Sequence, residues 1–271
     1  MDLKIRGKRA FVSGSSSGIG KAIALELAKE GCDVVVHGRD KTRSEETAHD
    51  VAALGVRSVV VIGDLATERG CDDVAKQTLA AFGAIDIVVN NAGMALLKHD
   101  PRWSEIPLKT WIDSFEVNFM STLRMSRHFL PGIEKSGWGR FVNISTGGAT
   151  VTPSLTEYTS AKAALNKLTA DMAKDVGRFG ATANGIAPGV VLTPAVEEWL
   201  GLIAKERSWS GGMPEWEQRF ISELAPQQAV KCFSRPEDIA AAAVFLASPR
   251  AAHISGVTLR VDSGHNSAVY L

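Results

Sequence analysis

The feature that most constrains the fold is a regular alternation of short, β-branched apolar runs with longer amphipathic stretches along most of the chain. The short runs predict strands at residues 9–13, 33–37, 58–62, 85–90, 140–144, 182–186 and 257–261. The longer stretches predict helices at residues 18–31, 42–54, 68–82, 108–130, 156–179 and 236–247. Strands and helices that alternate in this way form βαβ crossovers, in which the strands are parallel.

Several of the predicted strands are apolar throughout rather than alternating, which is typical of a sheet covered on both faces. We therefore predict an α/β fold: one doubly wound domain over residues 1–271, with a parallel seven-stranded sheet and helices on both faces. Residues 194–232 fit neither pattern, and we expect them to be irregular. In such folds, ligands bind at the carboxyl ends of the strands.

The charge balance argues against a polyanionic partner. Lys and Arg together number 30, as do Asp and Glu, so no net field would attract nucleic acid or an anionic membrane. No apolar stretch approaches the ~20 residues that span a bilayer, and the charged start does not resemble a signal peptide. Cys32, Cys71 and Cys232 are far apart, which indicates neither a metal site nor a disulfide framework. We expect a cytoplasmic protein that uses no metal.

A glycine-rich loop joins the first predicted strand to the first predicted helix. It reads Ser13-Gly14-Ser15-Ser16-Ser17-Gly18-Ile19-Gly20. At the positive end of a helix, glycines let backbone amides approach a pyrophosphate closely. The spacing differs from the common G-x-G-x-x-G fingerprint, but the position between strand and helix favours dinucleotide binding over a plain tight turn.

The end of the second strand should distinguish NADP from NAD. A carboxylate there would bind the ribose diol of NAD, whereas an arginine would bind the 2′-phosphate of NADP. Arg39 is placed to bind that phosphate, and Asp40 is the competing residue, although it could instead cap the next helix. We predict that NADP(H) is favoured over NAD(H).

Polar residues with possible catalytic roles follow the middle strands. Asn90-Asn91-Ala92-Gly93 follows the fourth strand and Ser145 the fifth, while Tyr158 and Lys162 lie one turn apart on a helix. A free tyrosine has a pKa near ~10, and lowering it by ~3 units requires about 4 kcal/mol. An ammonium one turn away, together with an oxidised nicotinamide, could supply that stabilisation.

Taken in order, these motifs closely resemble the short-chain dehydrogenase/reductase family, in particular its 3-oxoacyl-ACP reductase-like ketone reductases. The set also includes Asn118 and Pro188-Gly189, and the resemblance extends from about Gly7 to Gly264. It implies a Rossmann fold and an NAD(P)-dependent oxidoreductase that acts on CH–OH groups. Ser13 stands where the family usually has threonine, and Asp262-Ser263-Gly264 replaces a more usual Asp-Gly-Gly.

The resemblance implies catalytic roles for four residues. Tyr158 would be the general acid in reduction and the base in oxidation, and Ser145 would hydrogen-bond the substrate oxygen. Lys162 would lower the pKa of Tyr158 and hold the nicotinamide ribose. Asn118 would hold a water molecule in a proton relay.

The resemblance also implies a cofactor cleft, in which Asp64 contacts adenine and Thr193 touches the nicotinamide side. Its expected residues are Gly14, Ser16, Ser17, Gly18, Ile19, Gly20, Arg39, Asp64, Leu65, Asn91, Ala92, Gly93, Tyr158, Lys162, Pro188, Gly189, Val191 and Thr193.

A segment at about residues 190–232 matches the family's lid over the substrate. Trp199, Trp209 and Trp216 within it suggest either an apolar, ring-containing substrate or packing of the lid helices onto the body of the protein or a neighbouring subunit. The resemblance further implies a homo-oligomer, usually a tetramer, in which helices 108–130 and 156–179 pack against symmetry mates.

The function we predict is hydride transfer between NADP(H) and a small-molecule ketone or secondary alcohol. One alternative is an NAD-dependent dehydrogenase of a sugar, polyol or steroid alcohol, in which Asp40 would bind the ribose of NAD. Another is a 3-oxoacyl thioester reductase, which would need a basic docking patch formed by Lys135, Arg140 and Arg178. The last is a non-catalytic dinucleotide sensor, although sensors typically lose the tyrosine or the lysine that this chain keeps.

Overall fold

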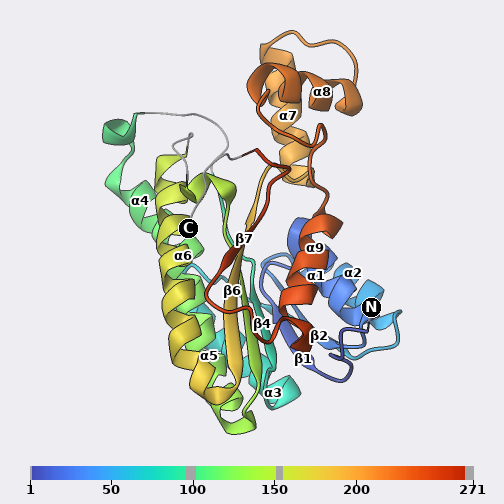
Figure 1. Cartoon of the computed structure of the whole chain (residues 1–271), viewed down its shortest axis with the longest axis vertical. Helices are drawn as coiled ribbons and strands as arrows, with labels where there is room; N and C mark the ends of the chain where they lie inside the picture. Colours follow the sequence, from blue (N-terminus) through green and yellow to red (C-terminus); the bar gives the residue numbers. More distant parts are fainter. Residues whose placement is uncertain (1, 96–101, 151–154, 266–271) are drawn as a thin grey trace.

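The computed structural model describes residues 2–95, 102–150 and 155–265, and it contains one seven-stranded sheet (Figure 1). All six strand pairs are parallel, as predicted, and the strand order is β3-β2-β1-β4-β5-β6-β7. The strands are β1 (Arg9–Val12), β2 (Asp33–Gly38), β3 (Ser58–Ile62), β4 (Ile87–Asn90), β5 (Gly139–Ile144), β6 (Ala181–Pro188) and β7 (Thr258–Val261). The strands are added outward from β1 in one direction as far as β3 and then in the opposite direction from β4, so the carboxyl ends of β1 and β4 open the crevice in which such folds bind ligands.

Helices cover both faces of the sheet. One face carries α1 (Gly18–Lys29), α2 (Lys41–Ala52) and α9 (Pro236–Leu246). The other carries α3 (Glu68–Phe82), α4 (Leu108–Phe115), α5 (Ser121–Ser136) and α6 (Thr156–Val176) (Figure 1). Successive side chains of β2 enter opposite cores: Val34 and Val36 pack under α1 and α9, and Val35 packs in the cluster that contains α3 and α5. This two-sided burial explains why the strand is apolar throughout.

The predicted helix 108–130 is wrong in its detail. After α4, one π-helical turn, Glu116–Met120, precedes α5, and α5 continues through Pro131 to a left-handed cap at Gly137. The π turn contains Asn118, whose side-chain amide donates to the Ser114 carbonyl at 3.0 Å. Single π turns inside helices occur frequently at functional sites. The predicted helix 156–179 likewise ends at Val176 and continues as a 3-10 turn.

The region expected to be irregular, 194–232, instead contains two helices. These are α7 (Pro194–Glu206) and α8 (Met213–Leu224), which stand above the carboxyl edge of the sheet (Figure 1). Thr193 caps α7 by accepting the Val196 amide, and Glu215 accepts the Gly212 amide at 2.9 Å at the start of α8. Both helices carry a proline in their first turn, where no amide donor is needed. We call residues 194–233 the cap.

The cap has a hydrophobic core of its own, separate from the two beneath the sheet faces. Trp209 is 8% exposed, and the Phe220 ring lies 5.3 Å from both the Trp199 and Phe233 rings. Trp216 packs against the same cluster. These tryptophans therefore pack within the cap itself, rather than onto the body of the protein as one of the two interpretations expected. No helix in the described part of the chain is long and apolar enough to cross a membrane.

Candidate active site

The glycine loop connects β1 to α1 as predicted, and its backbone requires glycine at several positions. Gly14 and Gly18 have φ values of +65° and +54°, in the left-handed region that side chains rarely adopt. A Cβ at Gly20 would collide with the carbonyl oxygen of Gly14. The first turn of α1 therefore lies directly against the loop.

Ser13 fastens this loop to the segment that follows β4. Its hydroxyl accepts the backbone amides of Asn91 and Ala92, both at 2.9 Å. In return, the Asn91 side-chain amide donates to the carbonyls of Ser13 and Gly14, at 2.9 and 3.2 Å. Ser13, which stands where the family usually has threonine, thus keeps the hydroxyl that accepts hydrogen bonds from these two backbone amides.

The amino-terminal end of α1 fits an anionic group. The side chain of Ser17, the N-cap residue, makes no capping hydrogen bond. Within the described residues, no acceptor is found for the first-turn amides of Gly18, Ile19 and Gly20. Unsatisfied amides at the positive end of a helix are well suited to bind a pyrophosphate.

At the end of β2, the two residues that could distinguish NADP from NAD, Arg39 and Asp40, differ in their interactions. The Asp40 carboxylate caps α2 by accepting the Arg43 amide at 3.1 Å, and it forms an ion pair with the Arg43 guanidinium at 2.9 Å. The hydrogen bond from the Arg43 amide is the main cause that lowers the pKa of Asp40. Arg39 is exposed and forms no ion pair with any described residue. Asp40 therefore has the capping role that the sequence left open.

Two further loops bring their predicted cofactor residues to the same edge. After β3, Asp64 is exposed and accepts the Ala66 amide at 3.1 Å through one carboxylate oxygen, while Leu65 is buried. After β6, Thr193 approaches the glycine loop, since a Cβ on Gly18 would lie 3.3 Å from its methyl group.

The remaining predicted cofactor residues lie on these same loops. Gly189 packs closely on the segment after β7, where an added Cβ would be 2.9 Å from the Asp262 Cα. Val191 is buried and pairs with Ser234 in a short parallel bridge at the base of the cap. Pro188 is the last residue of β6, and Ser16 lies beside Gly38 at the end of β2.

The π turn brings Asn118 against the segment after β4. The fully buried Asn118 side chain exchanges two hydrogen bonds of 3.0 Å with the backbone of Met94, one as donor and one as acceptor. A Cβ on Gly93 would lie 2.8 Å from the Asn118 oxygen and 3.2 Å from the Lys162 ammonium nitrogen. Asn118, Gly93 and Lys162 are therefore neighbours, as their predicted roles require.

Ser145, Tyr158 and Lys162 meet between the end of β5 and the start of α6. The Lys162 ammonium donates to the Ile144 carbonyl at 2.7 Å and lies 5.9 Å from the centre of the Tyr158 ring. The Ser145 hydroxyl donates to the Lys162 carbonyl at 3.4 Å. These contacts place all four predicted catalytic residues at one end of the sheet.

Burial shifts the pKa values of both Tyr158 and Lys162. Burial raises the pKa of Tyr158 to about 12, and a hydrogen bond with the Thr146 side chain only partly opposes this rise. Burial also lowers the pKa of Lys162 to about 8. Lys162 is not among the groups that shift the pKa of Tyr158 in the chain by itself. The predicted lowering, which needs the oxidised nicotinamide as well, stays a prediction.

Two residues of this region were missed as functional candidates. Thr146 hydrogen-bonds Tyr158, and only its place directly after Ser145 could have suggested this. His37 is buried and hydrogen-bonded to the glycine loop. A histidine inside an otherwise apolar strand was the available signal.

The basic docking patch considered for acyl carrier protein does not form at this site. Arg140 is the second residue of β5, at the edge of the sheet opposite to Ser145, and it is buried. Lys135 is in the last turn of α5, near that same opposite edge, and Arg178 forms an ion pair with Asp175.

Comparisons with known proteins cover nearly the whole chain. A sequence profile described as enoyl-(acyl carrier protein) reductase matches residues 14–266. D-beta-hydroxybutyrate dehydrogenase of Rhizobium meliloti (strain 1021) is 34% identical over 95% of this chain and 98% of its own. L-sorbose reductase from Gluconobacter frateurii, solved with NADPH and L-sorbose, is 32% identical with a TM-score of 0.91, covering 99% of this chain and 100% of its own. A 7α-hydroxysteroid dehydrogenase, solved with NADH and 7-oxo glycochenodeoxycholic acid, is 31% identical with a TM-score of 0.84, covering 99% and 98%.

Proposed function

Because this chain belongs to the short-chain dehydrogenase/reductase family and is an oxidoreductase that acts on CH–OH groups, we propose that it transfers a hydride between NADP(H) and a ketone or secondary alcohol. The observation that carries the proposal is the meeting of Ser145, Tyr158 and Lys162 beside a loop whose free helix amides fit a pyrophosphate. A sensor would have no use for this set of side chains.

In the direction of reduction, the carbonyl carbon gains a hydride and the carbonyl oxygen gains a proton. Bound NADPH would supply the hydride. The Tyr158 hydroxyl would give the proton to the oxygen, and the Ser145 hydroxyl would donate a hydrogen bond to the same oxygen as its negative charge develops. Lys162 would hold positive charge near the phenolate that Tyr158 becomes. Asn118 would fix the Gly93–Met94 backbone that borders the site.

The protonation state of Tyr158 fits the role of general acid at neutral pH. With a pKa of about 12, its hydroxyl keeps its proton at pH 7 and can donate it to the carbonyl oxygen. Oxidation would need the phenolate, which positive charge near the ring, such as that of an oxidised nicotinamide, would favour.

The end of β2 supports NADP(H) over NAD(H). Arg39 is exposed and pairs with no acidic side chain in the described part of the chain, so it could bind a 2′-phosphate, whereas Asp40 is engaged by Arg43 and by the amino-terminal end of α2. The similarity to a reductase solved with NADPH agrees with this choice. A similar dehydrogenase was solved with NADH, so NAD(H) is the alternative that the experiment must distinguish.

The test is consumption of NADPH or NADH by the purified protein with a panel of carbonyl compounds. The panel would contain a keto-sugar, a 3-oxo acid, a ketosteroid, cyclic diketones and aryl ketones. We expect turnover of at least one ketone, faster with NADPH than with NADH. Cofactor binding without turnover of any carbonyl compound would contradict the enzymatic proposal, and faster turnover with NADH would contradict the cofactor assignment.

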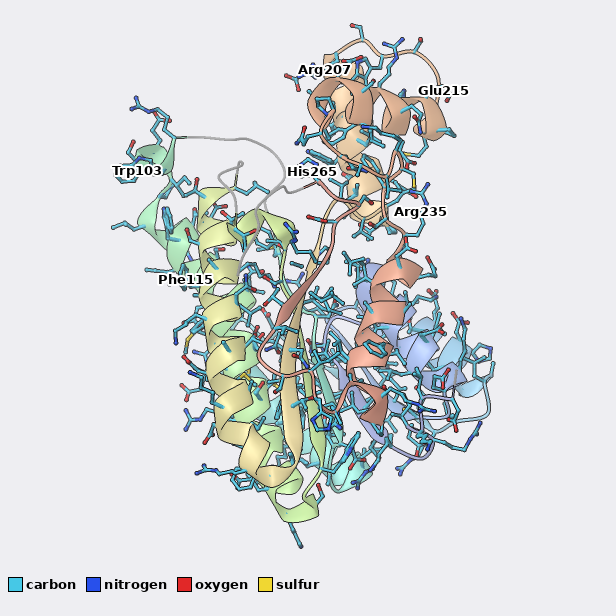
Figure 2. The ribbon with its side chains drawn as sticks, in the orientation of Figure 1. Trp103, Phe115, Arg207, Glu215, Arg235 and His265 are labelled. Atoms are coloured by element: carbon cyan, nitrogen blue, oxygen red, sulfur yellow. The ribbon has the colours of Figure 1, made fainter. Side chains whose placement is uncertain are left out.

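We also propose that the protein is a homo-oligomer. Three large apolar side chains around α4 are highly exposed: Trp103 by 71%, Leu108 by 80% and Ile112 by 61%. Trp103 lies at the left of the molecule in Figure 2, away from the cap, which carries Arg207 and Glu215. Light scattering behind size-exclusion chromatography should give a mass well above 28.9 kDa, and a monomer would reject the proposal.

A further inference from the structure

His37, near the end of β2, hydrogen-bonds two loops of the cofactor site at once. Its Nδ1 accepts the backbone amide of Gly14 at 3.1 Å, and its Nε2 lies 3.2 Å from the Gly63 carbonyl oxygen. Gly14 belongs to the glycine loop, and Gly63 immediately precedes Asp64. One imidazole ring therefore spans the loop after β1 and the loop after β3.

The backbone of the same residue strengthens this link. The His37 carbonyl accepts the Ser15 amide at 2.8 Å, and the His37 amide donates to the Ser15 hydroxyl at 2.9 Å. That hydroxyl in turn donates to the Val12 carbonyl at 2.7 Å. The glycine loop is thus held to β2 by backbone and side chain together.

The hydrogen bonds fix the protonation of the ring. An amide N–H points at Nδ1, so Nδ1 carries no proton, and the single ring proton is on Nε2, where it is donated to the Gly63 carbonyl. The ring is 3% exposed and packs 5.8 Å from the Phe11 ring, so water has little access to these groups. A side chain without an acceptor at this position would leave the Gly14 amide without its partner.

We propose that His37 is a positioning residue for the cofactor, which holds the glycine loop in the shape that binds the pyrophosphate. The inference rests on the proposed function, since it concerns the same cofactor site. The ring does not touch the reacting atoms at the end of β5, so its loss should weaken binding of NADP(H) rather than slow the chemical step. KM for NADPH should therefore rise much more than kcat falls.

The test compares two variants of nearly equal shape, His37→Asn and His37→Leu. Both shorten the side chain and leave a similar cavity, but only asparagine carries an oxygen near the position of Nδ1 that can accept the Gly14 amide. An unsatisfied buried amide costs about 1–3 kcal/mol, so the Leu variant should bind NADPH about 5- to 150-fold more weakly than the Asn variant. His49→Asn, at an exposed position of α2, is the control and should match the wild type.

Dissociation constants for NADPH would be measured by fluorescence titration, together with KM, kcat and melting temperature. Asn and Leu variants that bind NADPH equally would overturn the inference, whatever their stabilities. If the Leu variant does not fold, His37→Phe, which keeps a ring but has no acceptor, replaces it in the same comparison. If the wild type turns over ketones and the variants have the same KM for NADPH as the wild type, only this inference is contradicted. If the wild type does not bind NADPH, the proposed function is contradicted as well.

Discussion

Replacing Arg39 by aspartate should weaken the preference for NADPH over NADH without harming the fold. Arg39 is exposed and forms no ion pair with a described residue, so the free energy of unfolding should change by no more than about 0.5 kcal/mol. A hydrogen bond to a charged partner contributes about 1.5–3 kcal/mol, which corresponds to about 10- to 150-fold in affinity. The value of kcat/KM for NADPH should fall by that factor. The value for NADH should not fall, because NADH has no 2′-phosphate.

The assay is steady-state turnover of the best ketone with each cofactor, for the wild type and for Arg39→Asp. Lys135→Glu is the control, since it makes the same change in net charge at the opposite edge of the sheet. A ratio of NADPH to NADH efficiency that stays within threefold (~0.7 kcal/mol) of the wild-type ratio would refute the assignment of Arg39. An equal shift in the control variant would show that only the overall field had changed.

Three further predictions concern the loop, the buried histidine and the cap. Gly20→Ala places a methyl group against the Gly14 carbonyl and should destabilise the protein by about 1–3 kcal/mol in urea unfolding, with weaker NADPH binding by titration. Burial lowers the pKa of His37 to about 4, below its unfolded value of 6.5, so the unfolded chain takes up the proton first as the pH falls. Unfolding free energy should therefore decrease by about 3 kcal/mol between pH 6.5 and 4, a loss that His37→Asn should remove. Phe220→Ala removes a ring from the core of the cap at a cost of about 3–5 kcal/mol, so amide hydrogen exchange should accelerate in residues 194–233 and not in α1.

The parts of the fold that the sequence predicted well are those where local pattern and burial agree. The strands were found because both faces of the sheet are covered, so that Val34, Val35 and Val36 are all apolar although they point to opposite cores. The glycine loop was found because its conformation excludes other residues, as the φ values of Gly14 and Gly18 show.

The parts that the sequence did not predict depend on contacts between distant residues. The cap helices are short, and their caps at Thr193 and Gly212 were readable, but their apolar residues form a separate small core rather than a continuation of the main one. The role of Asp40 was left open because a carboxylate before a helix fits both a ribose and an N-cap.

The protonation states at the site could not be predicted from spacing alone. A lysine one turn from Tyr158, with an oxidised nicotinamide nearby, suggested a lowered pKa, whereas burial raises the pKa of the tyrosine in the chain by itself. His37 was similarly ambiguous, because its partners Gly14 and Gly63 follow different strands and come together only in the folded sheet.

The central claim is that Tyr158 gives the proton that completes reduction of a carbonyl, and Tyr158→Phe tests it most directly. The variant would be compared with the wild type for turnover of the best ketone with NADPH and for NADPH binding by fluorescence titration. General acid catalysis contributes about 10²- to 10⁴-fold, so kcat should fall by at least about 100-fold while the dissociation constant for NADPH stays within about twofold. Turnover within about tenfold of the wild type (~1.4 kcal/mol), with cofactor binding intact, would contradict the assignment of Tyr158 and the mechanism built on it.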